Sequence, residues 1–219
     1  MRVLIACEYS AIVRDAFRRR GHDAWSCDLL PTEGDPQWHF EGDVMGVIYM
    51  EGPWDLMIAH PPCTYLTASA EWAYKDEQKK NMKQGTLFGA ERRQAREEAI
   101  EFFMDLANAP IEKIAIENPI GVMSTRWREP DQFIQPYEYG EDASKRTCLW
   151  LKNLPRLKPT GLCMPRLALS KDGRSHVMRW GNQTDSGQNK LPPSEDRGHL
   201  RSATYHGWAE AMAEQWGDA

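Results

Sequence analysis

Short apolar runs alternate with segments of helical periodicity along most of the chain. The runs are roughly four to eight residues long, as strands are, and apolar residues at helical spacing lie between them. Strands that alternate with helices predict βαβ units, and therefore an α/β fold with a mostly parallel sheet and helices on both faces. The expected strands are Arg2–Ala6, Asp23–Leu30, Trp54–Ala59, Lys113–Ile116 and Thr147–Leu151, and the expected helices are Ser10–Arg20, Glu91–Asn108 and Thr204–Trp216.

Two stretches interrupt this alternation. Residues 68–89 are polar and lysine-rich, and we expect a mobile loop there because they follow a Pro-Pro-Cys turn. Residues 158–200 are rich in Gly, Pro, Ser and Asn, and structureless segments this long are uncommon in compact domains unless they are functional. The pattern predicts one α/β domain from residues 1–154 and 201–219, with residues 155–200 as a small irregular lobe.

Composition is that of an ordinary globular protein. The 219 residues are enough for one domain with a sizeable core, and 41% of them are hydrophobic and 27% charged. The chain has no apolar run of about 18 residues, and its start reads as a strand and not as a signal peptide. Five scattered cysteines without a C-x-x-C pair argue against a disulfide framework and a zinc site. We therefore expect a protein of a reducing, cytoplasmic setting, without a metal.

Charge is distributed unevenly. The net charge is −5, but residues 156–201 hold nine Lys and Arg against four acidic residues. Charge runs are usually solvated surface, whereas a basic segment on an acidic protein is also the footprint of a nucleic-acid binder. The sequence leaves both interpretations open.

The residues that follow the expected strands are candidates for a binding site, since ligands in such sheets bind beyond the carboxyl ends of the strands. Residues Cys7–Ser10 follow the first strand, where a nucleotide-type cofactor lies against the turn and the next helix. Asp28 follows the second strand at the distance of an acid that accepts ribose hydroxyls, and Asp43 is placed to meet an adenine amino group.

Two further strand ends carry reactive side chains. His60-Pro61-Pro62-Cys63 ends one strand, and the two prolines present the cysteine at a rigid position. A cysteine there is a candidate nucleophile. Glu117 ends the next expected strand, where a carboxylate is costly to bury unless it has a partner or a function.

This ordered pair of motifs resembles DNA cytosine-5 methyltransferases, in which Pro-Cys carries the nucleophile and Glu-Asn carries the glutamate that binds cytosine. More narrowly, the chain is similar to short cytosine methyltransferase-like proteins of bacteriophages and prophages. The resemblance extends over nearly the whole chain. It rests on Ala6-Cys7-Glu8-Tyr9-Ser10, His60-Pro61-Pro62-Cys63-Thr64-Tyr65-Leu66, Ile116-Glu117-Asn118-Pro119-Ile120-Gly121, Lys145-Arg146-Thr147-Cys148-Leu149-Trp150-Leu151 and Ser186-Gly187-Gln188-Asn189-Lys190-Leu191-Pro192-Pro193.

The resemblance implies a Rossmann-like class I fold, S-adenosylmethionine as cofactor and DNA with a flipped cytosine as substrate. It implies catalytic roles for Cys63, Glu117 and either Lys145 or Arg146, and stacking of aromatic side chains such as Trp72 on the base. The cofactor-binding residues expected are Cys7, Glu8, Ser10, Asp28, Asp43 and Pro61, and the substrate-binding residues expected are Pro62, Tyr65, Asn118, Arg174 and Lys190.

The chain departs from the family pattern in several places. The glycine-rich first motif is absent from residues 6–11, and Thr64 stands where glutamine usually follows Pro-Cys. Residues 155–200 stand in place of a large target-recognition domain. These departures leave two alternatives open: the same chemistry on a free nucleotide or single strand, and a catalytically idle module that binds DNA or cofactor. Amino-nitrogen methylation is less favoured, since Asp-Pro-Pro-Tyr is replaced by His60-Pro61-Pro62-Cys63.

Overall fold

The computed structural model describes residues 1–68, 70–77, 85–170, 172–192, 194 and 202–218. Its main feature is a seven-stranded sheet in the order β3-β2-β1-β4-β5-β7-β6, and a separate two-stranded sheet pairs β8 with β9. The strands are β1 (Arg2–Ala6), β2 (Asp23–Asp28), β3 (His39–Glu41), β4 (Leu56–Ala59), β5 (Lys113–Pro119), β6 (Gln132–Ile134), β7 (Thr147–Lys152), β8 (Arg166–Leu169) and β9 (His176–Arg179). The longer helices are α1 (Ile12–Arg19), α2 (Val44–Met50), α3 (Gly89–Ala107) and α6 (His206–Gly217), and α4 (Met123–Arg126) is a single turn.

Strand directions confirm the expected fold class. The pairs from β3 to β5 are parallel, and β7 runs antiparallel to both β5 and β6. This is a Rossmann-like arrangement, a mostly parallel doubly wound sheet with one antiparallel strand inserted near its edge. Successive strands step outward from β1 to β3 and then return to the other side at β4, so the sheet has its topological switch point between β1 and β4. Ligands in doubly wound sheets bind at that point.

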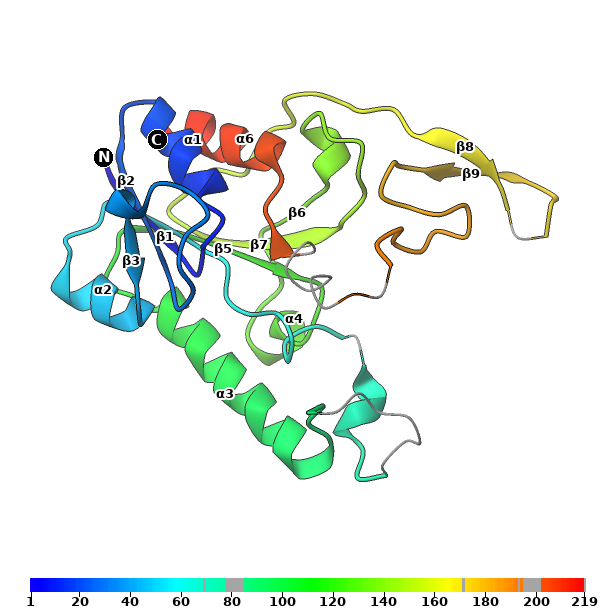
Figure 1. Cartoon of the computed structure of the whole chain (residues 1–219), viewed down its shortest axis with the longest axis horizontal. Helices are drawn as coiled ribbons and strands as arrows, with labels where there is room; N and C mark the ends of the chain where they lie inside the picture. The colour runs from blue at the N-terminus through cyan, green and yellow to red at the C-terminus, as the bar shows by residue number, and fades with distance from the viewer. Residues whose placement is uncertain (69, 78–84, 171, 193, 195–201, 219) are drawn as a thin grey trace.

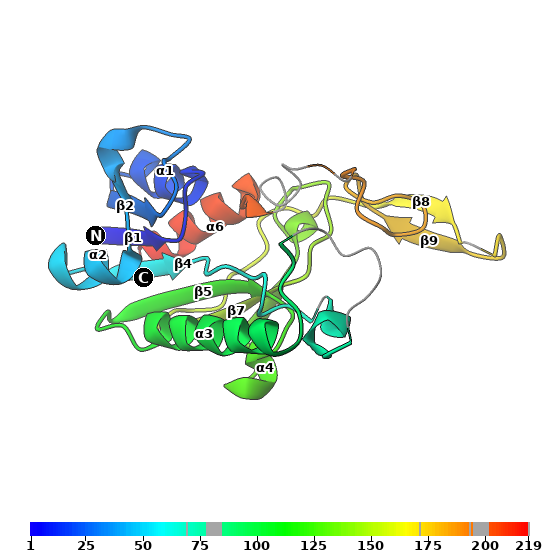
Figure 2. The same ribbon diagram turned by 60° about the horizontal axis from the view of Figure 1, so that its bottom comes forward.

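Helices cover both faces of the sheet, as Figure 1 and Figure 2 show. On one face, α1 and α6 bury a cluster that includes Phe17, Trp208 and Trp216. On the other face, α2 and α3 pack over a cluster that includes Phe103 and Trp150. Because the central strands are buried on both sides, they read as continuous apolar runs in the sequence.

Short elements account for most differences from the sequence-based prediction. The pattern did not predict β3, α2 or β6, of which the two strands have three residues each. The strand expected from Trp54 begins at Leu56 instead, while Trp54 is buried and donates its indole N–H to the carbonyl oxygen of Val47. The helix expected from Ser10 begins at Ile12, and the one expected from Thr204 begins at His206.

Residues 155–192 are more ordered than an irregular lobe. The prediction of no regular structure is wrong for β8 and β9, which form a hairpin that projects from the body of the molecule (Figure 1). Leu157 lies in the core against α6, so the segment begins on the main domain. The loop base is anchored too, since Asn182 exchanges hydrogen bonds with the backbone of Ser144 and Trp180 stacks on Tyr137 at 4.3 Å.

The polar stretch after the Pro-Pro-Cys turn is also partly structured. Residues 71–74 form a 3-10 turn, and Tyr74 is buried with Arg96 of α3 over its ring at 3.4 Å. The stretch expected to be a mobile loop therefore contains one regular turn packed on α3, and residues 69 and 78–84 lie outside the described part. No helix in the described ranges is long and apolar enough to span a bilayer.

Candidate active site

The turn after β1 takes a conformation that glycine usually supplies. Cys7 and Ala11 both have left-handed backbone angles, with φ of 60° and 63°. Glu8 lies between them and is buried, and its carboxylate accepts the backbone N–H groups of Val13 at 2.8 Å and Arg14 at 3.2 Å. The N-terminus of α1 thus receives a carboxylate of the chain itself, where a dinucleotide fold would receive a phosphate.

Two acidic residues lie close to this turn, as the sequence predicted. Burial raises the pKa of the Cys7 thiol well above its ordinary value, and the negative charges of Asp28 and Asp43 raise it further. Asp28 is half-buried, while Asp43 is exposed and caps α2 by accepting the N–H of Met45 at 3.0 Å. Carboxylates on neighbouring strand ends are suited to the hydroxyl and amino groups of a nucleoside.

A pocket opens at the switch point between β1 and β4. It is lined by Cys7, Glu8, Tyr9, Ser10, His60, Ser202, Ala203 and Thr204. The hydroxyl groups of Tyr9 and Ser202 lie 3.0 Å apart across it. The turn residues predicted for the cofactor therefore meet His60 and the segment before α6 in one cavity.

His60 and Glu117 face each other across β4 and β5. The parallel register pairs Ala59 with Ile116, so the next residue on each chain comes side by side. Nδ1 of His60 lies 3.2 Å from Oε2 of Glu117, and each side chain is only 11–12% exposed. Nε2 of His60 and Oε1 of Glu117 are both buried without a hydrogen-bond partner among the described residues.

The protonation state of Glu117 is set by opposing effects. Burial acts to raise its pKa, but the hydrogen bond from His60, the positive charges of Lys145 and His60, and the Thr147 hydroxyl together lower it below its usual value. Glu117 is therefore a carboxylate at neutral pH. Burial also raises the pKa of Glu8, against the opposing charge of His60 and the hydrogen bonds to α1.

Backbone and amide contacts join the two motifs. The Asn118 side chain donates to the carbonyl oxygen of Pro61 at 2.8 Å. The segment after Cys63 then pairs with the segment after Pro119, since Val122 N–H donates to the Leu66 carbonyl at 2.8 Å. Gly121 permits this approach, because a Cβ at that position would overlap the Leu66 carbonyl.

The cysteine of the Pro-Pro-Cys turn lies on the surface of these two paired segments. Cys63 and the preceding Pro62 are exposed, and the Cys63 carbonyl accepts the backbone N–H groups of Leu66 at 3.1 Å and Thr67 at 3.0 Å. The tight turn fixes the backbone at the cysteine while its side chain remains accessible. The other described cysteines differ, since Cys27 and Cys148 are buried in strands.

The structure distinguishes Lys145 from Arg146. Lys145 contributes a positive charge to Glu117 and lies 5.9 Å from the Trp208 ring. The guanidinium of Arg146 instead lies 4.0 Å over the ring of Phe133. Because successive side chains alternate along β7 and its approach, only Lys145 faces the side that holds Glu117.

The predicted substrate residues occupy three places. Tyr65 is half-buried, with Arg92 of α3 at 5.3 Å over its ring, and Trp72 is half-buried in the following 3-10 turn. Arg174 is exposed in the turn between β8 and β9, and Lys190 is exposed beyond the hairpin. Arg174 thus lies out on the hairpin, whereas the Lys190 backbone N–H donates to the carbonyl of Asn182, which is hydrogen-bonded to Ser144 at the approach to β7.

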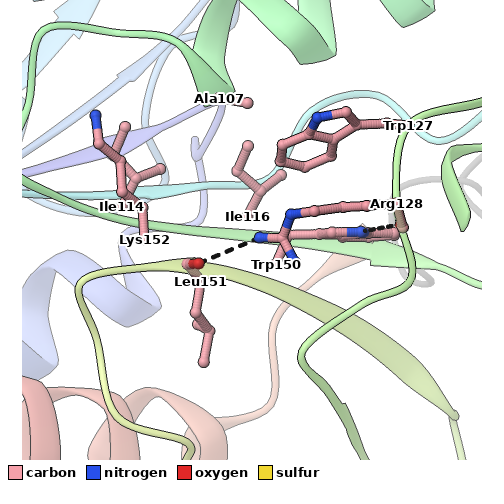
Figure 3. Close-up of a pocket in the computed structure, with 8 residues that line it drawn as sticks. All are labelled: Ala107, Ile114, Ile116, Trp127, Arg128, Trp150, Leu151 and Lys152. Carbon is pink, nitrogen blue, oxygen red and sulfur yellow. Dashed lines mark hydrogen bonds between the residues drawn. The ribbon is translucent and has the colours of Figure 1, made fainter.

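Another pocket, shown in Figure 3, lies away from these strand ends. It sits between α3, β5 and β7, where the Trp150 indole donates to the Arg128 carbonyl at 2.9 Å and Arg128 in turn donates to the Leu151 carbonyl. Its walls are mainly core side chains. We regard it as a packing defect beside Trp127 and not as a reaction site.

Sequence reasoning overlooked two residues of the site. His60 was treated only as the residue before the Pro-Pro pair, although a polar residue directly after a buried strand was a usable signal. Gly121 was quoted within a motif without a role, and its need for close backbone approach becomes apparent only in three dimensions.

No family model matches the sequence, and no curated protein matches it. Among solved structures, 54 chains match. One is a protein assigned as a DNA modification methyltransferase and encoded within an Escherichia coli prophage. It is 13% identical with a TM-score of 0.42, and the match covers 74% of this chain and 51% of the other. The chain thus spans about half the length of that protein.

Proposed function

We propose that this protein methylates cytosine at ring carbon 5 in DNA, with S-adenosylmethionine as methyl donor. One observation carries the proposal: the Pro-Pro-Cys63 turn and the Glu117-Asn118 strand end are joined at the carboxyl edge of a Rossmann-like sheet, with Oε1 of Glu117 buried and unpartnered among the described residues. A buried carboxylate oxygen without a partner costs about 1–3 kcal/mol. A base amino group would satisfy it.

The turn after β1 suits this cofactor. Asp28 and Asp43 would hold its ribose hydroxyls and adenine amino group, with Cys7, Ser10 and Pro61 around them. Glu8 already occupies the N-terminus of α1, which disfavours a cofactor that needs a phosphate there. S-adenosylmethionine has no phosphate and, when bound, supplies a methyl group from its sulfonium.

The side chains at the strand ends divide the remaining work. The Cys63 thiolate attacks ring carbon 6, which makes carbon 5 nucleophilic. Oε1 of the Glu117 carboxylate accepts a hydrogen bond from the cytosine amino group, and Lys145 stabilises negative charge that develops on the ring. Carbon 5 would then take the methyl group as the bond between methyl and sulfonium breaks, leaving a neutral thioether. A base, for which water would serve, removes the carbon-5 proton; the electron pair of that bond restores the double bond between carbons 5 and 6, and Cys63 leaves as thiolate.

Basic residues of the 155–192 segment would hold the DNA backbone. Arg174 and Lys190 are exposed, and their contacts would be to phosphates. Extrusion of the base costs a few kcal/mol. Tyr65 and Trp72, near the Pro-Pro-Cys turn, would stack on the extruded cytosine.

The test is transfer of labelled methyl from S-adenosylmethionine to unmethylated duplex DNA of mixed sequence. We expect the label as 5-methylcytosine, its loss in Cys63→Ala, and its retention in the matched control Cys163→Ala. Deoxycytidylate and single-stranded DNA are assayed in parallel. Label on these alone would show that the substrate is a free nucleotide or a single strand and not duplex DNA. Cofactor binding without any transfer would indicate an idle module and overturn the proposal.

A further inference from the structure

His60 has no role in the chemistry described so far, although it lies at the centre of the site. Its imidazole is 11% exposed and lines the pocket at the switch point together with Glu8. Its backbone N–H extends the sheet by donating to the Ala6 carbonyl at 2.9 Å. The backbone that carries the ring is therefore fixed at the end of β4.

The side chain of His60 contacts only one of the two carboxylate oxygens of Glu117, the residue proposed to bind the base. Nδ1 lies 3.2 Å from Oε2 of Glu117, and a carboxylate in that pair makes Nδ1 the donor. Oε1 is left with no partner within the described residues. One oxygen of Glu117 is thus held by the protein, and the other is available to a ligand.

Glu8 lines the same pocket as His60, on the cofactor side. The charges of the two groups interact, and Glu8 accepts hydrogen bonds from the backbone N–H groups of Val13 and Arg14 and from the hydroxyl of Ser10 at 3.3 Å. Besides His60, Glu117 interacts with the positive charge of Lys145, from the approach to β7, and with the hydroxyl of Thr147.

We propose that His60 is a positioning residue for Glu117: by donating Nδ1–H to Oε2, it fixes the orientation of the carboxylate and aims Oε1 at the substrate base. This inference rests on the proposed function for the identity of the base. Its structural part, the restraint of Glu117 by His60, is independent of any substrate. A loosened carboxylate would bind the base in the wrong geometry, and displacements of about 1 Å at a reacting centre can cost about 100-fold in rate.

Two substitutions distinguish the effect of the Nδ1 donor from the effect of side-chain size at position 60. In His60→Asn, the amide nitrogen takes the place of Nδ1 and can still donate to Oε2. In His60→Gln, the donor is displaced toward the position of Nε2 and cannot. We expect His60→Asn to retain activity within a few fold, and His60→Gln to lose about 100-fold in kcat with little change in KM for DNA. His206→Gln, on the exposed start of α6, is the control.

A second readout does not need turnover. The carboxyl carbon of Glu117, followed by NMR as pH is lowered, should titrate below the usual range in the wild type and in His60→Asn. In His60→Gln its titration should move upward, because the main group that offsets burial is displaced. Thermal melts of all variants report whether each is folded.

The outcomes distinguish the two proposals. Wild-type protein that forms no 5-methylcytosine removes the proposed function and the role of His60 in it. Normal wild-type turnover with equal kcat in His60→Gln, or an unmoved Glu117 titration in that variant, overturns the positioning role alone. Equal losses in Asn and Gln variants would also overturn it, since they would show that the ring and not the Nδ1 donor matters.

Discussion

The carboxyl edge of the sheet and the β8–β9 hairpin differ in how their side chains are held. At the edge, Glu8 is buried, the side chains of His60 and Glu117 are only 11–12% exposed, and the three groups are linked through a hydrogen bond and charge. On the hairpin, Leu167 is 67% exposed and Met178 is 61% exposed, and they face the same side of the two-stranded sheet. A polar network shielded from solvent fixes geometry, whereas an exposed pair of strands can adapt to a partner. The proposed function assigns the chemistry to the edge and the contact with DNA to the hairpin, and the predictions below test that division.

The largest effect should come from removing the charge of the base-binding group. Glu117→Gln keeps the shape of the side chain but replaces a charged acceptor with a neutral amide. Loss of one preorganised electrostatic contact typically costs about 100- to 1,000-fold in kcat. Labelled-methyl transfer measures the rate, with cofactor binding as a control for folding. Activity near that of the wild type would mean that the edge does not carry the chemistry.

The next effect concerns the joint between the two motifs, that is, the pairing of the segment around Leu66 with the segment around Gly121 and Val122. Gly121→Ala places a methyl group against the Leu66 carbonyl, and overpacking of this kind costs about 1–3 kcal/mol. Gly46→Ala is the matched control, since a Cβ there has nothing within 4 Å and the position is helical. Ala at Gly46 should be neutral or stabilising by up to about 1 kcal/mol. Urea unfolding compares the two, and equal stabilities would show that the joint is loose.

A substitution on the hairpin should change the salt dependence of DNA binding and leave the stability of the fold unchanged. Arg174→Ala is expected to weaken DNA binding about equally for all sequences and to reduce the slope of log affinity against log salt by about 1. Arg156→Ala is the control, because Arg156 is exposed beside the main domain and not on the hairpin. Binding titrations at several salt concentrations measure both. Identical slopes for wild type and Arg174→Ala would remove the hairpin from the DNA interface.

The smallest expected effect is on the pH dependence of stability. The pKa of Glu8 is raised by burial above its unfolded value of about 4.5, so the folded state binds the proton more tightly. Below pH 4.5 this favours folding, and the benefit is lost as pH rises through the folded pKa. Glu8→Gln cannot titrate, so the stability of the wild type relative to this variant should fall as pH rises from about 4 toward neutrality.

Urea unfolding of wild type and Glu8→Gln at matched pH values checks this. The comparison isolates Glu8 because all other titrating groups are common to both proteins. A difference that stays constant with pH would show that Glu8 titrates alike in both states.

The fold could be predicted from sequence where elements are long and apolar. The strands from Arg2 and Lys113 and the helix from Glu91 all appear near the expected positions, because burial on both faces produces a clear apolar signal. β3 and β6 could not be predicted, since three-residue edge strands depend on their neighbours for pairing. The hairpin was not predicted, because the surrounding sequence is rich in loop-forming residues. Its exposed strands also lack the alternation of apolar and polar residues that usually marks a strand.

Prediction of the site depended on topology. The order of strand ends placed Cys7, Asp28 and Asp43 in one region, and in the structure the two aspartates lie close enough to Cys7 to raise the pKa of its thiol beyond the effect of burial. The choice between Lys145 and Arg146 required the side on which each faces, which the sequence did not show. The roles of Cys63 and Glu117 in catalysis remain predictions, to be decided by the methyl-transfer assay.

The left-handed turn after β1 shows that this loop shape does not require glycine. Left-handed geometry costs an ordinary residue about 1–2 kcal/mol, and here Cys7 and Ala11 both adopt it. The buried carboxyl group of Glu8, which lies between these two residues, accepts the backbone N–H groups of Val13 and Arg14 in the first turn of α1, and so offsets part of this strain. Glycine and an internal hydrogen-bond acceptor are thus alternative ways to stabilise one loop shape. A search of the sequence for glycines detects only the first of these ways. A chain that uses the second can keep the same loop shape without them.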